Sequence, residues 1–111
     1  MAANEKIIDN FSKAIFPKTI AAVGGRECEE MIRQCEKAGF KGTIWPVNPR
    51  RDTLSGRACF ASVNDLPSVP DVAFVAIPRE PTISTVEDLA EMGCQGVVCY
   101  ASGFAEVADG E

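Results

Sequence analysis

The chain has 111 residues, of which 46% are hydrophobic and 24% charged, and its formal net charge is −5. This composition is typical of one small folded domain and excludes disordered, collagen-like and low-complexity proteins. The net negative charge argues against nucleic acid and membrane partners. The longest apolar run, Val72–Ile77, is too short to span a bilayer, and the charged first ten residues resemble no signal peptide. We therefore expect a cytoplasmic protein.

Histidine is absent from the sequence, and its absence removes several kinds of chemistry. Ser–His and Cys–His nucleophile pairs, histidine-bound metals and a phosphohistidine are all excluded within this chain. The five cysteines are an odd number and none of them forms a CxxC pair, so they are predicted to be free thiols in a reducing compartment. We predict neither a metal site nor a catalytic residue.

Strands and helices are predicted to alternate along the first half of the chain. Residues 4–15 form a predicted amphipathic helix. The apolar positions that define its face are Ile7, Ile8, Phe11 and Ile15. Thr19–Val23 is a short apolar strand, and Gly24–Gly25 follows it directly. A second helix is predicted over Glu27–Ala38, with Gly39 at the left-handed position that ends many helices.

The middle of the chain contains two further predicted strands. Thr43–Val47 is the first, and its internal proline suits the end of a strand because proline donates no hydrogen bond. A polar stretch follows from Asn48 to Pro70, with a possible short strand at Ala58–Phe60. Val72–Ile77 is unbroken and apolar, which is typical of a strand covered on both faces in a parallel sheet.

The last predicted elements are a helix over Thr82–Met92 and a strand over Gly96–Tyr100. The inward-facing positions of that helix are predicted to be Ile83, Val86 and Ala90, with Leu89 beside them. The alternation predicts an α/β fold: a Rossmann-like open parallel sheet with helices on both faces, in three layers. We divide the chain into the helix at residues 1–15 and a domain at 16–111. No helix is predicted after the last strand, so the domain is expected to be truncated at its C-terminus.

Ligands of open parallel sheets bind beyond the carboxyl ends of the strands. The predicted strands place four turns there. The residues of these turns are Gly24, Gly25 and Arg26; Val47, Asn48, Pro49, Arg50 and Arg51; Ile77 and Pro78; and Ala101, Ser102, Gly103 and Phe104. All four turns combine small or turn-forming residues, so this edge of the sheet is the candidate binding site.

Gly24 and Gly25 stand where a strand meets the start of a helix. Glycine lets the backbone approach an anion closely, and the free N–H groups of a helix N-terminus attract phosphate. The full G-x-G-x-x-G pattern is absent, however, and three glutamates follow within the first turn of the helix. A tight turn without a ligand therefore remains an alternative.

The second turn carries charge of the opposite sign. Enzymes that bind NAD usually have an acidic residue at the end of the second strand, where this sequence has Asn48. Arg50 and Arg51 would instead suit a ribose that carries a phosphate. NADP and coenzyme A (CoA) both present such a group, whereas arginines on a solvated loop with no ligand are the alternative.

The order of these motifs resembles a known family. The segments that carry the resemblance are Phe16–Gly25, Gly39–Pro49, Gly56–Phe60, Val69–Ala73, Ile77–Pro78 and Gly103–Glu106. Together they resemble the N-terminal CoA-binding domain of NDP-forming acyl-CoA synthetases, which are relatives of the succinyl-CoA synthetase alpha subunit. Two departures from the family pattern stand out: the loop after Val23 is several residues shorter, and Ala101 replaces a serine.

The resemblance implies a Rossmann-like domain that holds CoA or acyl-CoA across its strand ends. It implies that the Gly24 loop faces the CoA phosphates, that the Asn48 loop lies by the adenosine, and that the turns at Ile77 and Ala101 line the path of the pantetheine arm. Phe104 is the aromatic residue that we expect to stack on adenine.

The family reaction interconverts acyl-CoA and acid through a phosphohistidine on a later domain. This chain would thus not be catalytic alone, and further synthetase domains or subunits would be its partners. Two other functions remain open: an interaction or regulatory module that has lost CoA binding, and an NADP-binding oxidoreductase domain.

Overall fold

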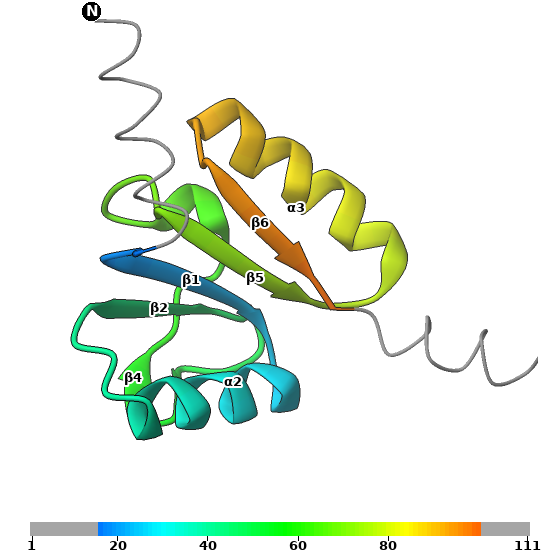
Figure 1. The fold of residues 1–111 in the computed structure, drawn as a ribbon. Helices are drawn as coiled ribbons and strands as arrows, with labels where there is room; N and C mark the ends of the chain where they lie inside the picture. The colour runs from blue at the N-terminus through cyan, green and yellow to red at the C-terminus, as the bar shows by residue number, and fades with distance from the viewer. Residues whose placement is uncertain (1–15, 101–111) are drawn as a thin grey trace, which may run out of the picture.

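Four parallel strands form the central sheet of the computed structural model, which describes residues 16–100 (Figure 1). The strands are β1 (Thr19–Gly24), β2 (Thr43–Val47), β5 (Val72–Ala76) and β6 (Gly96–Cys99), in the spatial order β2-β1-β5-β6. In the register of the sheet, Val23 of β1 lies beside both Val47 and Val75. The neighbouring strands β2, β1 and β5 therefore end at the same edge of the sheet, which brings the turns that follow them together.

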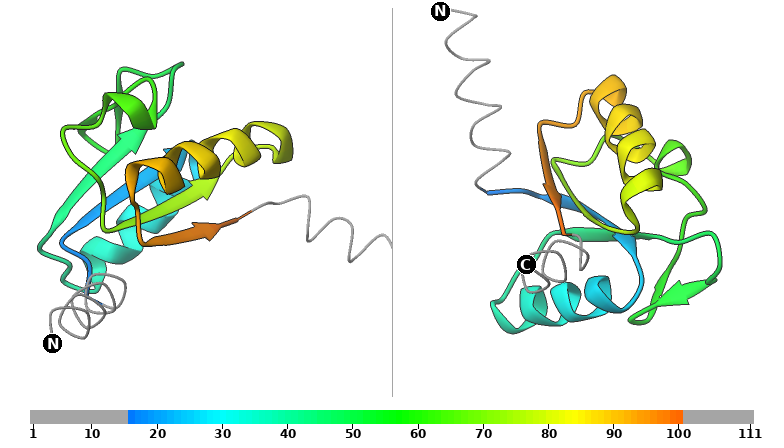
Figure 2. Two further views of the ribbon diagram at one scale, coloured as in Figure 1. Left: turned by 90° about the horizontal axis from the view of Figure 1, so that it is seen from above. Right: turned by 90° about the vertical axis from the view of Figure 1, so that its right-hand side faces the viewer.

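Two helices cover opposite faces of this sheet (Figure 2). On one face, α2 (Arg26–Lys37) packs its buried Cys28 and Ile32 against Ile20 and Ile44. On the other face, α3 (Arg79–Met92) packs Leu89 against a separate apolar cluster. The strand members of that cluster are Ala21, Val23, Val47, Ala73 and Val75. Because strand side chains alternate between faces, β1, β2 and β5 each supply residues to both clusters. The predicted α/β fold in three layers is confirmed.

The start and the inner face of the helix predicted over Thr82–Met92, which is α3, need correction. The helix α3 begins at Arg79 rather than Thr82, with Pro81 in its first turn. A proline is tolerated there because the backbone N–H of the first turn has no partner within the helix. Ile83, predicted to face inward, is 60% exposed, and Ala90 is exposed as well.

Leu89 is the fully buried side chain of α3. The reason lies outside the helix itself. The short 3-10 helix η1 (Val63–Asp65) and Leu66 supply part of the cluster that Leu89 joins, so contact with this segment sets how α3 is rotated on the sheet. Helical periodicity alone contains no information about that contact.

The polar stretch after β2 contains a small hairpin where the sequence suggested one short strand at 58–60. Its strands β3 (Thr53–Leu54) and β4 (Arg57–Ala58) pair antiparallel around Ser55 and Gly56. Both turn residues have positive φ, +52° and +78°, as a type I′ hairpin turn requires. Leu54 anchors the hairpin in the core, whereas Phe60 leaves it and forms a single parallel bridge with Val47. The predicted strand is therefore divided between two pairings.

All five cysteines are free thiols, and Cys28 is fully buried on the inner face of α2. Burial raises the pKa of the Cys28 thiol from 9.0 to about 12, with smaller contributions from Glu27 and Cys59. The folded protein holds this proton more tightly than the unfolded chain does. The resulting stabilisation is complete below pH 9 and is lost as the pH rises from 9 towards 12.

We expect the urea midpoint of unfolding to fall over that alkaline range, and to fall less steeply in a Cys28→Ala variant. Cys99 is exposed, so Cys99→Ala is the matched control and should follow the wild-type pH dependence. Urea denaturation at a series of pH values measures both. Parallel pH profiles for the two variants would contradict the role assigned to Cys28.

Candidate functional site

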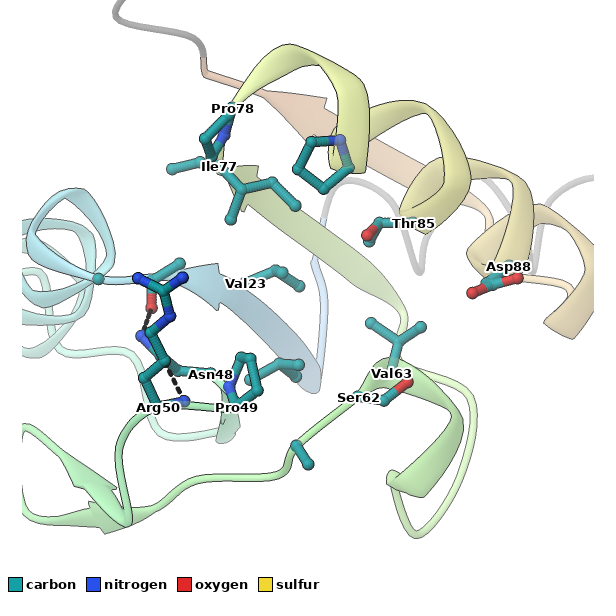
Figure 3. A pocket seen from close by; sticks show the side chains of 16 residues that line it. Val23, Asn48, Pro49, Arg50, Ser62, Val63, Ile77, Pro78, Thr85 and Asp88 are labelled. Atoms are coloured by element: carbon teal, nitrogen blue, oxygen red, sulfur yellow. Dashed lines mark hydrogen bonds between the residues drawn. The ribbon is translucent and has the colours of Figure 1, made fainter.

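The carboxyl ends of β1, β2 and β5 open onto one cleft of about 550 Å³ (Figure 3). This volume lies within the range of small-molecule sites, roughly 300–1,000 Å³. The residues that line the cleft are Val23, Gly24, Gly25, Val47, Asn48, Pro49, Arg50, Ala61, Ser62, Val63, Ala76, Ile77, Pro78, Pro81, Thr85 and Asp88. Three of the four predicted turns thus meet in one cleft, while the fourth, at 101–104, lies outside the described residues, as does the predicted helix at 4–15.

The turn between β1 and α2 is built on two glycines with different roles. Gly24 has a φ of +143°, and a Cβ there would lie 2.4 Å from the carbonyl oxygen of Ala76 on the next strand. Gly25 stands at the N-cap of α2 with negative φ, and no side chain caps the helix there. The backbone N–H groups of the first turn of α2 are therefore available to a ligand, as anion binding at a helix N-terminus requires.

Asn48 joins this turn to the loop after β2. Its amide nitrogen Nδ2 donates to the Gly24 carbonyl at 2.9 Å, and its Oδ1 accepts from the Arg50 backbone N–H at 2.8 Å (dashed lines in Figure 3). An aspartate could accept the second bond but could not donate the first. Asparagine, unlike the acidic residue of NAD-binding domains, can therefore make both hydrogen bonds that join the two loops.

The arginines of the two turns occupy different places. All three arginines are exposed, but Arg50 is among the residues that line the cleft, whereas Arg51 and Arg26 are not. Arg51 lies with Nη1 3.4 Å from Oε1 of Glu29, and its Nη2 lies near Gly25. Among the described residues, Arg50 is therefore the arginine that lines the cleft.

The glutamates at the start of α2 leave the cleft open. Glu29 pairs with Arg51, and Glu30 bonds to Gln34 and Arg33 on the outer face of the helix. Hydrogen bonds from Gln34 and then Arg33 lower the pKa of the Glu30 carboxyl group. None of the glutamates of this turn is among the residues that line the cleft.

The end of the cleft away from Gly25 contains polar side chains that the sequence analysis missed. Ser62 comes from the N-cap of η1, while Thr85 and Asp88 come from α3 (Figure 3). Pro81, Thr85 and Asp88 follow one another at helical spacing, which puts them on one face of α3. That spacing is the signal that could have found them, once the rotation of α3 was known.

Within residues 16–100, no group of three or more histidine, cysteine, aspartate or glutamate side chains is placed to hold a metal ion. In the same part of the chain, no helix has the length and apolar character needed to cross a membrane.

A glycine turn at a helix N-terminus, at the edge where parallel strands end, defines a Rossmann-like nucleotide-binding domain. The arginine in the cleft fits a phosphorylated ligand. The particular family follows from comparison with known proteins. The family model described as "CoA binding domain" matches residues 18–109, and the chain belongs to this family. The resemblance inferred from the motif order is confirmed.

Curated relatives of the chain are CoA ligases. A trans-feruloyl-CoA synthase from an unknown prokaryotic organism is 38% identical over 98 residues, which covers 84% of this chain and 14% of that protein. An ADP-forming acetate–CoA ligase of Archaeoglobus fulgidus is 30% identical over 104 residues, covering 89% and 16%. The chain thus spans about one seventh of the length of the curated relatives it matches.

Solved structures with the same fold include part of a dinucleotide-forming acetyl-CoA synthetase of Ca. Korarchaeum cryptofilum in complex with phosphate and ADP. It is 31% identical, with a TM-score of 0.67, and the match covers 77% of this chain and 20% of that one. A hypothetical protein of Pyrococcus horikoshii matches with a TM-score of 0.67 at 25% identity, covering 92% of this chain and 77% of that one. The chain is therefore similar both to one part of a large synthetase and to a protein of nearly its own size.

Proposed function

We propose that the cleft binds CoA, with the pyrophosphate against the N-terminus of α2 and the 3′-phosphate at Arg50. The observation that supports this most directly is the pairing of an uncapped helix N-terminus at Gly25 with a guanidinium in the same cleft. Backbone N–H groups suit an anion whose negative charge is spread, while arginine binds a terminal phosphate with two hydrogen bonds.

Arg51 is the second guanidinium near this site, and we propose that it contributes once a phosphate is present. Its partner Glu29 is about half exposed, and an exposed pair of this kind contributes little to stability, ~1 kcal/mol or less. A phosphate near Gly25 could therefore compete with Glu29 for the Arg51 side chain.

We propose that the parent protein joins an acid to the CoA thiol, with this domain as its CoA-holding part. The curated relatives are named as CoA ligases, and each is several times longer than this chain. The phosphohistidine expected from the family resemblance must lie on another domain or subunit, because this sequence contains no histidine. The free thiols favour a reducing compartment such as the cytoplasm.

Calorimetric titration with CoA and with dephospho-CoA, which lacks the 3′-phosphate, tests the proposal. We expect Arg50→Ala to weaken CoA binding about tenfold or more, because a charge-assisted hydrogen bond contributes ~1.5–3 kcal/mol. Dephospho-CoA should bind the wild type and the variant equally. Lys41→Ala, an exposed position just before β2, is the charge-matched control. Equal wild-type affinity for CoA and dephospho-CoA would contradict the proposed binding of the 3′-phosphate by Arg50.

A thermal-shift series with CoA, NADP and ATP separates this function from its two alternatives. A ligand at 100 times its Kd adds ~2.7 kcal/mol to the free energy of unfolding, which is a clear rise in Tm. Stabilisation by CoA supports the proposal, and a larger effect of NADP would favour an oxidoreductase domain. No shift with any of the three would identify a module that has lost its ligand.

A further inference from the structure

The cleft has two ends of opposite charge, joined by an apolar middle (Figure 3). Arg50 and the start of α2 lie at one end, and Asp88 of α3 lies at the other. The side chains between them include Val23, Pro49, Val63 and Ile77. A nucleotide has a matching division, with anionic phosphates, a flat apolar base face and a polar base edge. A nucleotide would match these charges with its phosphates towards Arg50 and its base towards Asp88.

Asp88 is placed to accept hydrogen bonds from such a base. Its side chain is half-buried on α3, and Oδ2 accepts from the Asn64 amide at 3.5 Å, the outer limit of a hydrogen bond. Asn64 is its only hydrogen-bond partner among residues 16–100. The carboxylate thus retains most of its capacity to accept, and an ionised carboxylate accepts without donating.

The groups beside Asp88 differ from it in hydrogen-bonding capacity. Thr85 lies one turn earlier on α3, and Ser62 faces the same end of the cleft from η1. Each hydroxyl can both donate and accept, so these two side chains adapt to any base edge. Asp88 is the lining residue that cannot donate, and it is therefore the one that can distinguish an amino group from a keto oxygen on the base.

Resting on the proposed CoA function, we propose that Asp88 selects adenine by accepting a hydrogen bond from its 6-amino group. A base with a keto oxygen at that position places an acceptor against the carboxylate, which leaves two acceptors without a donor between them. A site that recognises a hydrogen-bond donor on its ligand through a buried or half-buried acceptor rejects an analogue that lacks this donor. The acceptor in the site is then left unpaired.

The test compares CoA with its desamino analogue, in which hypoxanthine replaces adenine. We expect the wild type to bind CoA roughly tenfold or more tightly than the analogue. Asp88→Asn should reduce this ratio to near one, because an asparagine amide can turn to donate to the keto oxygen. Glu87→Gln is the matched control: this exposed neighbour on α3 is not among the cleft-lining residues, and the variant should keep the wild-type ratio.

The outcomes separate the two proposals. Equal wild-type affinity for CoA and its desamino analogue, with CoA clearly bound, would overturn the role of Asp88 and leave the CoA site intact. Tighter binding of both ligands by Asp88→Asn would also overturn it, since the carboxylate would then act only by repelling phosphate. Failure of the wild type to bind CoA at all would overturn both. Thermal denaturation of each variant confirms that the fold is unchanged.

Discussion

Replacing Gly24 by alanine is expected to destabilise the domain by about 2 to 6 kcal/mol, a large part of the stability of a domain this size. Two effects act together. A non-glycine residue is strained at a φ of +143°, and its Cβ would lie 2.4 Å from the backbone carbonyl oxygen of Ala76. That oxygen belongs to β5, which pairs with β1 at this position and cannot move without breaking the sheet. Urea denaturation followed by the fluorescence of the single tryptophan, Trp45, measures the loss.

Gly25→Ala is the matched control for this prediction. Gly25 has negative φ, and a Cβ there meets its nearest side-chain atom, Arg51 Nη2, at 3.7 Å, which is ordinary contact. We expect the free energy of unfolding of the Gly25→Ala variant to differ from that of the wild type by less than about 1 kcal/mol. The new methyl group would instead stand between the helix N-terminus and a phosphate, so binding of CoA should weaken while the fold persists. Equal destabilisation by the two substitutions would contradict this division of roles.

Leu89→Ala is expected to destabilise the protein by about 2 to 5 kcal/mol and to weaken ligand binding as well. Leu89 is fully buried, and it is the residue by which α3 enters the core beneath the cleft. The same helix presents Pro81, Thr85 and Asp88 to the cleft. The cavity left by the substitution would loosen the wall that holds them. Urea denaturation gives the loss of stability, and calorimetry with CoA gives the loss of affinity.

Ile83→Ala serves as the control on the same helix. It removes the same number of carbon atoms, but Ile83 is 60% exposed, so the change in stability should stay within about 0.5 kcal/mol. Affinity for CoA should be unchanged. If Ile83→Ala were the more damaging substitution, the rotation of α3 described here would be wrong, and the inward face predicted from periodicity would be right.

These two helix positions show where sequence reasoning reached its limit. The strands were predictable because short apolar runs ended by glycine or proline have few other interpretations, and Val72–Ile77 was predicted within one residue of β5. The inner face of α3 was not predictable, because Ile83, Val86 and Ala90 satisfy helical periodicity as well as the buried Leu89 does. Its contact with η1, which comes from a polar stretch earlier in the chain, decides which of them is buried.

The candidate site divides in the same way. Gly24, Asn48, Arg50 and Ile77 were predictable from their place directly after strands, since parallel strands bring their ends to one edge. Ser62, Thr85 and Asp88 reach the same cleft from η1 and α3, where position along the sequence gives no comparable rule. Arg50 and Arg51 are neighbours in sequence, yet only Arg50 lines the cleft, because Arg51 lies against Glu29.

The amide group of Asn48 has a consequence for the thermodynamics of binding. With one hydrogen bond to Gly24 and another to Arg50, it ties the two cleft-lining loops into a single frame before any ligand binds. The conformational entropy of those loops is then lost when the chain folds, so less is lost when a molecule binds. Asn48 can in this way increase affinity without contacting the ligand, through the order it imposes beforehand.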